Sequence, residues 1–420
     1  MIRKHIALSL VLTATAASIA LLPGHAAAQQ NTADGISVAE APRPDYEASG
    51  VRVGGFIVSP SLDIGITHDT NIYATDTDEK SATIGIIAPA VTVKSGWSNH
   101  ALGFSASAEI GRYSKHSSEN YEDYRLGADG RVDISRETMF NLAATYDKGH
   151  EERGSADAVN GAKPTETTTE AATIGLTHSV GRLSTEFSLG AQDLEFDNVL
   201  TSLGTTINNH DRNRDIVEGM IRADYEFSPG YSAFVLGALN KRDYDDAVDD
   251  NGFNRDSDGY RLRAGARINL TGVVFADVYV GYLKQDYKDA ALKTAKGSQL
   301  GLAGIWNVTQ LTTVKADLGR AINETTVTGA SSTLDTAGTV TVDHEMLRNL
   351  LLRATAGYTK SSFEGTTRKD KLWDLGFGAT YKMNPNLHLS ADYSYKNRDS
   401  NVALTDYDRS QIMLRLKLQM

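Results

Sequence analysis

The chain has 420 residues, no cysteine, 37 glycines and only 8 prolines, and its 53 acidic and 42 basic residues give a formal charge of −11. The lack of cysteine excludes disulfides and Cys-ligated metal sites, and the lack of a basic patch or tail argues against a nucleic-acid partner. Beyond the N-terminus, no stretch holds the roughly 18 consecutive apolar residues of a membrane helix. This excludes a helical membrane protein but not a membrane barrel, whose strands are only half apolar.

Residues 1–28 have the features of a secretory signal. Arg3 and Lys4 supply the positive start, an apolar core follows, and Ala26 to Ala28 form a small-residue cleavage site. We favour a signal over a short anchoring helix because the core is short and no second hydrophobic segment follows it. The segment therefore predicts Sec-type secretion. Residues 29–55 are polar and aperiodic, so we predict a flexible periplasmic segment there.

From residue 56 to residue 420 the chain is a series of segments in which apolar and polar side chains alternate. In the last segment, Ile412 and Leu414 share one parity with the other apolar residues, while Arg415 and Lys417 share the opposite parity. Successive side chains of a strand point to opposite faces, so this segment has one apolar and one charged face. We predict an all-β fold, a transmembrane antiparallel β-barrel of about 18 strands that the C-terminal strand closes by pairing with the first.

The connections between these segments alternate in length. Long polar loops and short turns that alternate along the chain are typical of outer-membrane barrels, which keep the turns in the periplasm and the loops outside. Short turns are predicted at 97–99, 135–137, 180–182, 228–230, 271–272, 309–310, 344–345 and 384–386, and long loops at 74–81, 114–121, 148–169, 197–212, 243–257, 287–296, 322–332, 361–370 and 397–408. Two strand segments are less regular, 84–93, which contains Pro89, and 231–239.

Aromatic residues gather near the predicted strand ends, as expected of two interfacial girdles. Near the long loops they are Tyr73, Tyr113, Tyr124, Tyr146, Tyr260, Tyr287, Tyr358 and Tyr395, and near the short turns Trp97, Phe140, Tyr225, Phe227, Tyr231, Trp306 and Tyr381.

The polar parity of the strands should line the lumen, and it carries charges of both signs. A dry interior could not hold so many charges without nearly complete pairing, whereas a barrel of this width holds water. We therefore predict a hydrophilic passage; the alternative is a wall stiffened by ion pairs around a lumen plugged by folded-in loops. The predicted lumen-lining residues are Glu109, Arg125, Arg131, Arg222, Arg261, Arg263, Arg267, Lys315, Arg353, Asp374, Arg415 and Lys417.

Two features could in principle support chemistry. His178 and Ser179 resemble a base and a nucleophile, but neighbours in a strand point to opposite faces and cannot form that pair. The acidic stretch 243–258 could gather a divalent cation, but it lacks the ordered spacing of a calcium loop, so a solvated acidic loop is favoured. We therefore predict no enzyme activity, no catalytic residues, no cofactor and no metal site.

The N-terminal half of the predicted barrel resembles the putative β-barrel porin 2 family of outer-membrane proteins. The resemblance rests on 50–54 leading into 60–62, on 68–73, on 97–102, on 117–124 and on 127–131. The chain differs from general barrel habit in ending at Met420, where a terminal aromatic residue is usual. The resemblance implies a link to exopolysaccharide production and export in Gram-negative bacteria.

Together these features predict an outer-membrane barrel that gives passive passage to a hydrophilic solute and assists exopolysaccharide export. The alternatives are a general diffusion porin for small solutes, a structural or adhesive surface barrel with a plugged lumen and, more remotely, an outer-membrane hydrolase. The expected partners are outer-membrane lipid, the solute or polysaccharide and the barrel-assembly machinery. No apolar patch in the sequence identifies an oligomer interface.

Overall fold

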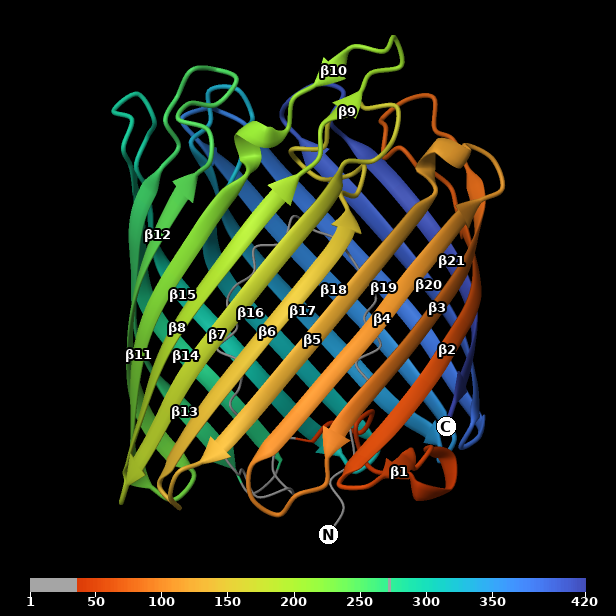
Figure 1. Ribbon diagram of the computed structural model, residues 1–420, viewed down its shortest axis with the longest axis vertical. Coiled ribbons are helices and arrows are strands. Elements are labelled where there is room, and N and C mark those ends of the chain that lie inside the picture. Colours follow the sequence, from red (N-terminus) through yellow and green to blue (C-terminus); the bar gives the residue numbers. More distant parts are fainter. Residues whose placement is uncertain (1–35, 271–272) are drawn as a thin grey trace.

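Eighteen long antiparallel strands form one closed wall in the computed structural model, which describes residues 36–270 and 273–420 (Figure 1). The strands are β2 (Phe56–Asp69), β3 (Ala82–Ser95), β4 (Ala101–Tyr113), β5 (Tyr121–Asp133), β6 (Thr138–His150), β7 (Glu166–Val180), β8 (Leu183–Phe196), β11 (Arg214–Ser228), β12 (Tyr231–Tyr244), β13 (Ser257–Leu270), β14 (Val274–Tyr287), β15 (Ala295–Thr309), β16 (Thr312–Glu324), β17 (Ser332–Leu347), β18 (Leu350–Glu364), β19 (Lys369–Asn384), β20 (Leu387–Ser400) and β21 (Tyr407–Gln419).

The first and last long strands close the barrel, as the sequence predicted. β2 pairs with β21 from Ser61 opposite Gln419 to Asp69 opposite Gln411, while its other edge pairs with β3. Below this seam β2 extends past the end of β21, and the short strand β1 (Val51–Val53) pairs with that part of β2. Closure leaves no long edge unpaired, which a sheet in hydrocarbon requires.

Small elements complete the fold. They are the 3-10 turns η1 (Pro44–Tyr46), η2 (Ser117–Glu119) and η3 (His210–Arg212) and a two-stranded hairpin, β9 (Val199–Leu200) with β10 (Thr206–Ile207). Within the described parts of the chain, no helix is long and apolar enough to cross a membrane. Figure 1 shows the long loops at one end of the barrel, and the short turns, β1 and the C-terminus at the other.

The apolar and polar parities lie on opposite faces of the wall. Ile412 and Leu414 are more than half exposed on the outside. The polar parity faces inward, because its side chains meet across strands that are not neighbours. Arg222 of β11 contacts Asp277 of β14 at 3.2 Å, and Arg242 of β12 pairs with Glu324 of β16. Only the concave face of a curved sheet brings side chains of such distant strands together.

Turns and loops alternate as predicted, but some predicted bounds are wrong. Residues 361–364 and 369–370 of the predicted loop 361–370 belong to β18 and β19, and only 365–368 connect these strands. His344 and Glu345 were predicted to form a turn, but both lie in β17, and the turn falls at 348–349. This polar pair is part of a strand because His344 contacts Thr312 at 2.9 Å and Glu345 binds a buried arginine. The turn predicted at 271–272 lies outside the described residues.

Pro89 lies within β3, and its ladder with β4 is interrupted between Ile87 and Ala90 because proline has no N–H to donate. The segment 231–239 belongs to the regular strand β12. Not every tyrosine predicted for the girdle near the long loops faces the membrane. The Tyr287 hydroxyl hydrogen-bonds to Glu324 inside the barrel, because β14 presents its odd-numbered residues inward.

Candidate functional site

One group of charged side chains on the inner wall lies on β11, β13 and β14. Arg222 donates to Asp224 at 2.7 Å and to Asp277 at 3.2 Å. Asp277 also accepts two hydrogen bonds from Arg267, at 2.8 and 3.0 Å. The strands bring these residues together because each contributes alternate side chains to the same face. Two arginines and two aspartates thus neutralise one another in a network along the wall.

Two more arginines of β13 continue this wall. Arg261 donates to Glu218 of β11 at 2.9 Å. Arg263 donates through Nε to Gln299 of β15 at 3.1 Å, and its guanidinium lies 4.3 Å from the ring centre of Tyr279. The predicted residues Arg222, Arg261, Arg263 and Arg267 therefore form one cluster, which we call the arginine wall.

The other predicted lumen residues are spread around the barrel. Most of them pair with a partner on the same or a neighbouring strand, as expected for a wall that satisfies most of its own charges. Four of them form ion pairs: Arg125 with Asp147, Arg131 with Asp133 at 2.8 Å, Arg353 with Asp343 at 2.7 Å and Lys315 with Glu40 at 2.7 Å. Glu109 accepts a hydrogen bond from the Tyr121 hydroxyl at 2.7 Å, and Arg415 contacts the Met413 sulfur at 3.0 Å. Asp374 and Lys417 are in register with Lys396 and Asp63 on the neighbouring strands.

Aromatic rings lie flat on the inner wall where a neighbouring strand has glycine. Tyr279 pairs in register with Gly301, where a Cβ atom would come within 2.0 Å of the tyrosine ring. Phe234 lies against Gly265 in the same way, and Arg222 stacks on this ring at 3.9 Å. The glycines are therefore needed for space, and they keep the rings from projecting into the lumen.

At the long-loop end, the connection between β6 and β7, residues 151–165, lies across the mouth of the barrel. Its Glu152 pairs with Arg409 of β21 at 2.8 Å, and its Asp157 accepts from the Thr325 hydroxyl at 2.6 Å. Thr325 follows β16. Around the barrel, β16 lies on one side of β6 and β7, and β21 lies on the other side. A loop that reaches both must cross the opening, so we call residues 151–165 the inward loop.

Two arginines fix the base of the inward loop. Arg153 forms two hydrogen bonds with Glu119, at 2.6 and 2.8 Å, and Arg212 of η3 forms two with Glu151, at 2.7 and 3.0 Å. Paired hydrogen bonds between arginine and a carboxylate restrict both distance and orientation. A hollow of about 340 Å³ lies between the inward loop and residues 73–80.

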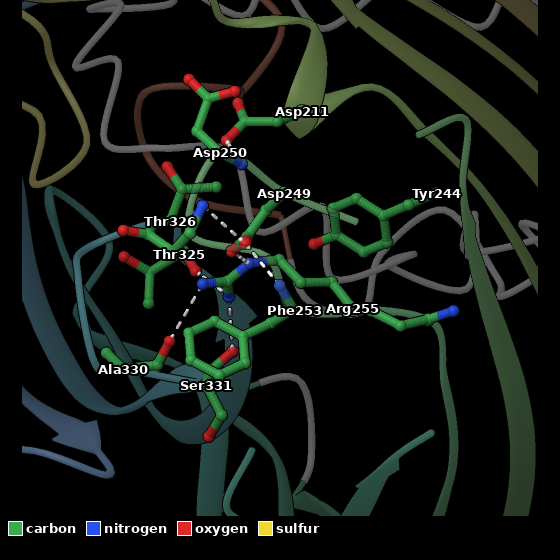
Figure 2. A network of polar contacts seen from close by, with 12 residues as sticks. Asp211, Tyr244, Asp249, Asp250, Phe253, Arg255, Thr325, Thr326, Ala330 and Ser331 are labelled. Carbon is green, nitrogen blue, oxygen red and sulfur yellow. Dashed lines mark hydrogen bonds and ion pairs between the residues drawn. The ribbon is translucent and has the colours of Figure 1, made fainter. Parts of the chain in front are cut away.

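A buried arginine, Arg255, joins its own loop to the loop between β16 and β17 (Figure 2). Arg255 donates to Asp249 at 2.6 Å, and both side chains are only 1 % exposed. Its other nitrogens donate to the main-chain carbonyls of Thr325 and Ala330, in the loop between β16 and β17. Above this pair, the Asp250 amide donates to Asp211 of η3. The acidic stretch 243–258 is thus tied into the loop assembly instead of being freely solvated.

Titratable groups in these loops have shifted pKa values. Burial, together with the neighbouring Asp250 and Asp249, raises the pKa of Asp211. Burial by itself would raise the pKa of Glu152, but the cations Arg409 and Lys396 more than offset it and hold that pKa below its ordinary value. Within residues 36–270 and 273–420, no group of three or more histidines, aspartates or glutamates could hold a metal ion.

At the short-turn end, residues 36–47 run along the inner wall from β15 to β20, and we call them the lumen arm. The Val38 amide donates to Thr313 at 2.8 Å, and Glu40 pairs with Lys315 at 2.7 Å. Farther along, His388 donates to the Tyr46 carbonyl at 2.9 Å. The sequence predicted a flexible segment over 29–55; residues 36–47 of that segment make these contacts, and residues 29–35 lie outside the described residues.

Arg43 anchors the middle of the lumen arm and has no exposed side-chain surface. Its guanidinium donates to the carbonyls of Val38 at 2.6 Å and Ala41 at 2.8 Å, and it pairs with Glu345 of β17. Reasoning from the sequence missed both this arm and the inward loop. Arg43 sits between two prolines in a polar stretch, and nothing local distinguishes it from an exposed residue.

His178 and Ser179, the pair considered for hydrolysis, do not hydrogen-bond to each other. His178 contacts the Thr138 hydroxyl at 2.9 Å, whereas Ser179 contacts Ser184 at 2.9 Å. The two side chains point to opposite faces of β7, as strand geometry requires.

The chain is similar in structure to the outer-membrane protein opdK from Pseudomonas aeruginosa (12 % identity, 86 % of this chain and 99 % of that chain covered, TM-score 0.45). It is also similar to a BenF-like porin from Pseudomonas fluorescens Pf-5 (9 % identity, 86 % and 99 % covered, TM-score 0.47) and to OccAB4 from Acinetobacter baumannii (10 % identity, 90 % and 100 % covered, TM-score 0.47). No curated protein matches the sequence.

The family model described as putative beta-barrel porin 2 matches residues 43–420, which includes every strand of the barrel. The apolar outer face, the closed wall and the loop asymmetry are those of a bacterial outer-membrane protein, with the short-turn end toward the periplasm. The chain therefore belongs to the putative β-barrel porin 2 family of bacterial outer-membrane porins.

Proposed function

We propose that the barrel gives passive passage to a hydrophilic solute through its lumen. The observation that carries this proposal is the inner face, where positively charged arginines and lysines lie beside negatively charged carboxylates. A wall of this kind is stable in contact with water, and an 18-strand barrel is wide enough to contain water. The charges are mostly paired, so a passing solute meets many weak polar contacts and no single strong one.

The cargo we favour is an exported polysaccharide, on the strength of the family resemblance. A hydrated polymer needs repeated weak contacts along its path, because one tight site would stop it. The paired charges and the flattened rings of Tyr279 and Phe234 form a wall without projecting obstacles. General diffusion of small solutes is the alternative for the same passage.

A second function is favoured by a different observation. The inward loop crosses the external mouth, and the lumen arm lies along the periplasmic end of the wall. Both are held by buried ion pairs, as a permanently plugged structural barrel would require.

Conductance of the purified protein in a planar bilayer separates these functions. We expect stepwise ion conductance that long polysaccharide added to the periplasmic side reduces, and that short oligosaccharides reduce less. Conductance indifferent to polysaccharide would assign the barrel to small solutes. Silence, in a protein shown to be folded by its heat-modifiable mobility in electrophoresis, would refute passage and favour the structural role. Loss of capsule or slime on deletion of the gene tests polysaccharide export in the cell.

A further inference from the structure

Arg263 differs from the other members of the arginine wall in the partners it has. Arg222, Arg261 and Arg267 each pair with a carboxylate at 3.2 Å or less. For Arg263, no carboxylate of the described residues lies within 4 Å, and the side chain that accepts its hydrogen bond is the neutral Gln299. The wall therefore presents one guanidinium whose charge is not locally neutralised.

Neutral groups hold this guanidinium in one orientation. The guanidinium stacks on the Tyr279 ring, 4.3 Å from the ring centre, and Gln299 accepts a hydrogen bond from Nε. Gln299 is itself fixed, because its amide donates to the Arg320 carbonyl at 2.6 Å. The Arg263 stem lies against Gly281, where a Cβ atom would come within 3.0 Å of Cγ. With Nε occupied and the stem packed, the two terminal nitrogens make no hydrogen bond to any described residue.

The surroundings of Arg263 strengthen its attraction for an anion. Leu236, which is in register with it on β12, is buried, and so are Met220 and Leu283 on the same inner face. Apolar neighbours lower the effective dielectric, so a charge there acts more strongly on a ligand than one surrounded by water. A fixed guanidinium with two free terminal nitrogens matches the two oxygens of a carboxylate.

We infer that Arg263 is a binding site in the lumen for the carboxylate of an acidic sugar. This inference rests on the proposed passage and narrows its cargo to uronate-bearing saccharides. The carboxylate forms two hydrogen bonds with the terminal nitrogens of Arg263, while the paired arginines on either side stay neutralised by their own aspartates and glutamate. The site holds a uronate unit weakly and releases it, so that a polymer advances.

Calorimetric titration of the detergent-solubilised protein with galacturonate tests the site without requiring conduction. Galactose is the matched ligand without the carboxylate. We expect galacturonate to bind and galactose to give no heat above dilution. Arg263→Gln should weaken galacturonate binding at least tenfold, and Arg263→Lys, which keeps the charge but loses the fork, by a smaller factor. Lys94→Gln is the charge-matched control, since Lys94 shares the inward parity of Ile84 on β3; it should change the affinity less than twofold.

The outcomes separate the site from the passage. Unchanged galacturonate binding in folded Arg263→Gln, or equal weakening in Lys94→Gln, would overturn the inference. Sulfate binding as strongly as galacturonate would overturn the carboxylate class. Acetate binding much more weakly than galacturonate would support a sugar acid over a simple carboxylate. Arg263-dependent binding in a barrel that never conducts would support the site and refute the proposed passage.

Discussion

The anchoring of the lumen arm by Arg43 gives a prediction whose size follows from the structure. Replacing Arg43 by glutamine removes the hydrogen bonds to Val38 and Ala41 and leaves the nearly buried Glu345 carboxylate without its main partner. Arg348 stays 3.7 Å from Glu345, but it is more than half exposed and compensates only in part. Breaking a buried ion pair on one side costs about 3–5 kcal/mol. We take about 3 kcal/mol, which shifts the equilibrium toward a released arm by roughly 100-fold.

Because the chain has no cysteine, one introduced cysteine reports the release of the arm. Ser37 is a suitable position, since it lies in the lumen arm and is fully buried. When opening is rapid, the rate of maleimide labelling follows the population of the released arm. Arg43→Gln in the Ser37→Cys background should therefore label about 100-fold faster. A cysteine at the exposed Ser98, in a short turn, is the control and should label at an unchanged rate.

The double variant Arg43→Gln with Glu345→Gln removes the buried charge on both sides. It should recover most of the loss and label within about tenfold of the parent, since an uncharged pair leaves no carboxylate uncompensated. Single-channel conductance should rise in Arg43→Gln and return toward the parent value in the double variant. If labelling at residue 37 in Arg43→Gln accelerated less than threefold, Arg43 would not hold the arm and the energetic argument would fail.

Three other predictions concern the loops and the wall. The pKa of Glu152 is held below its ordinary value, so its ion pair with Arg409 stabilises the inward loop at neutral pH and is lost as the pH falls through that lowered pKa. Hydrogen exchange in the inward loop, corrected for intrinsic rates, should accelerate over that range, and Glu152→Gln should remove the pH step; a pH-independent profile in the parent would contradict this. Arg255→Gln leaves Asp249 buried and unpaired, so added protease should cut the loop between β16 and β17, while the parent resists. Gly301→Ala forces the Tyr279 ring off the wall and should lower the free energy of unfolding in lipid vesicles by about 1–3 kcal/mol. Adding Tyr279→Ala to Gly301→Ala should restore it. Equal free energies of unfolding for the parent, the single variant and the double variant would show that the close contact carries no cost.

The lumen is bounded by the strands of the wall, by the inward loop at one end and by the lumen arm at the other. The strands are fixed by continuous ladders, whereas the inward loop and the lumen arm are held by a few side-chain contacts each. Elements of this kind open at a lower free energy than the barrel itself. Any control of passage is therefore expected at the loop and the arm and not in the strands.

The sequence by itself determined the strands, their faces and the alternation of turns with loops, because these depend on neighbours along the chain. A period of two places apolar side chains toward lipid, and turn residues end each strand at the required length. The closing pair β2 and β21 was also predicted correctly, because a closed barrel must pair its first strand with its last. The same local logic failed at 344–345, where a polar pair looks like a turn although Glu345 is the partner of a distant arginine.

Only the tertiary structure decided which charges meet. Arg261 and Arg263 are equivalent in the sequence, separated by one leucine on the same strand, yet strand register gives Glu218 to the first and Gln299 to the second. Arg43 and Glu345 are 302 residues apart, and Asp157 and Thr325 are 168 apart. Such contacts depend on the curvature of the closed wall and on loops folding back into it. No periodicity along the chain encodes them, because the distance between two side chains inside a barrel is set by the strands between them.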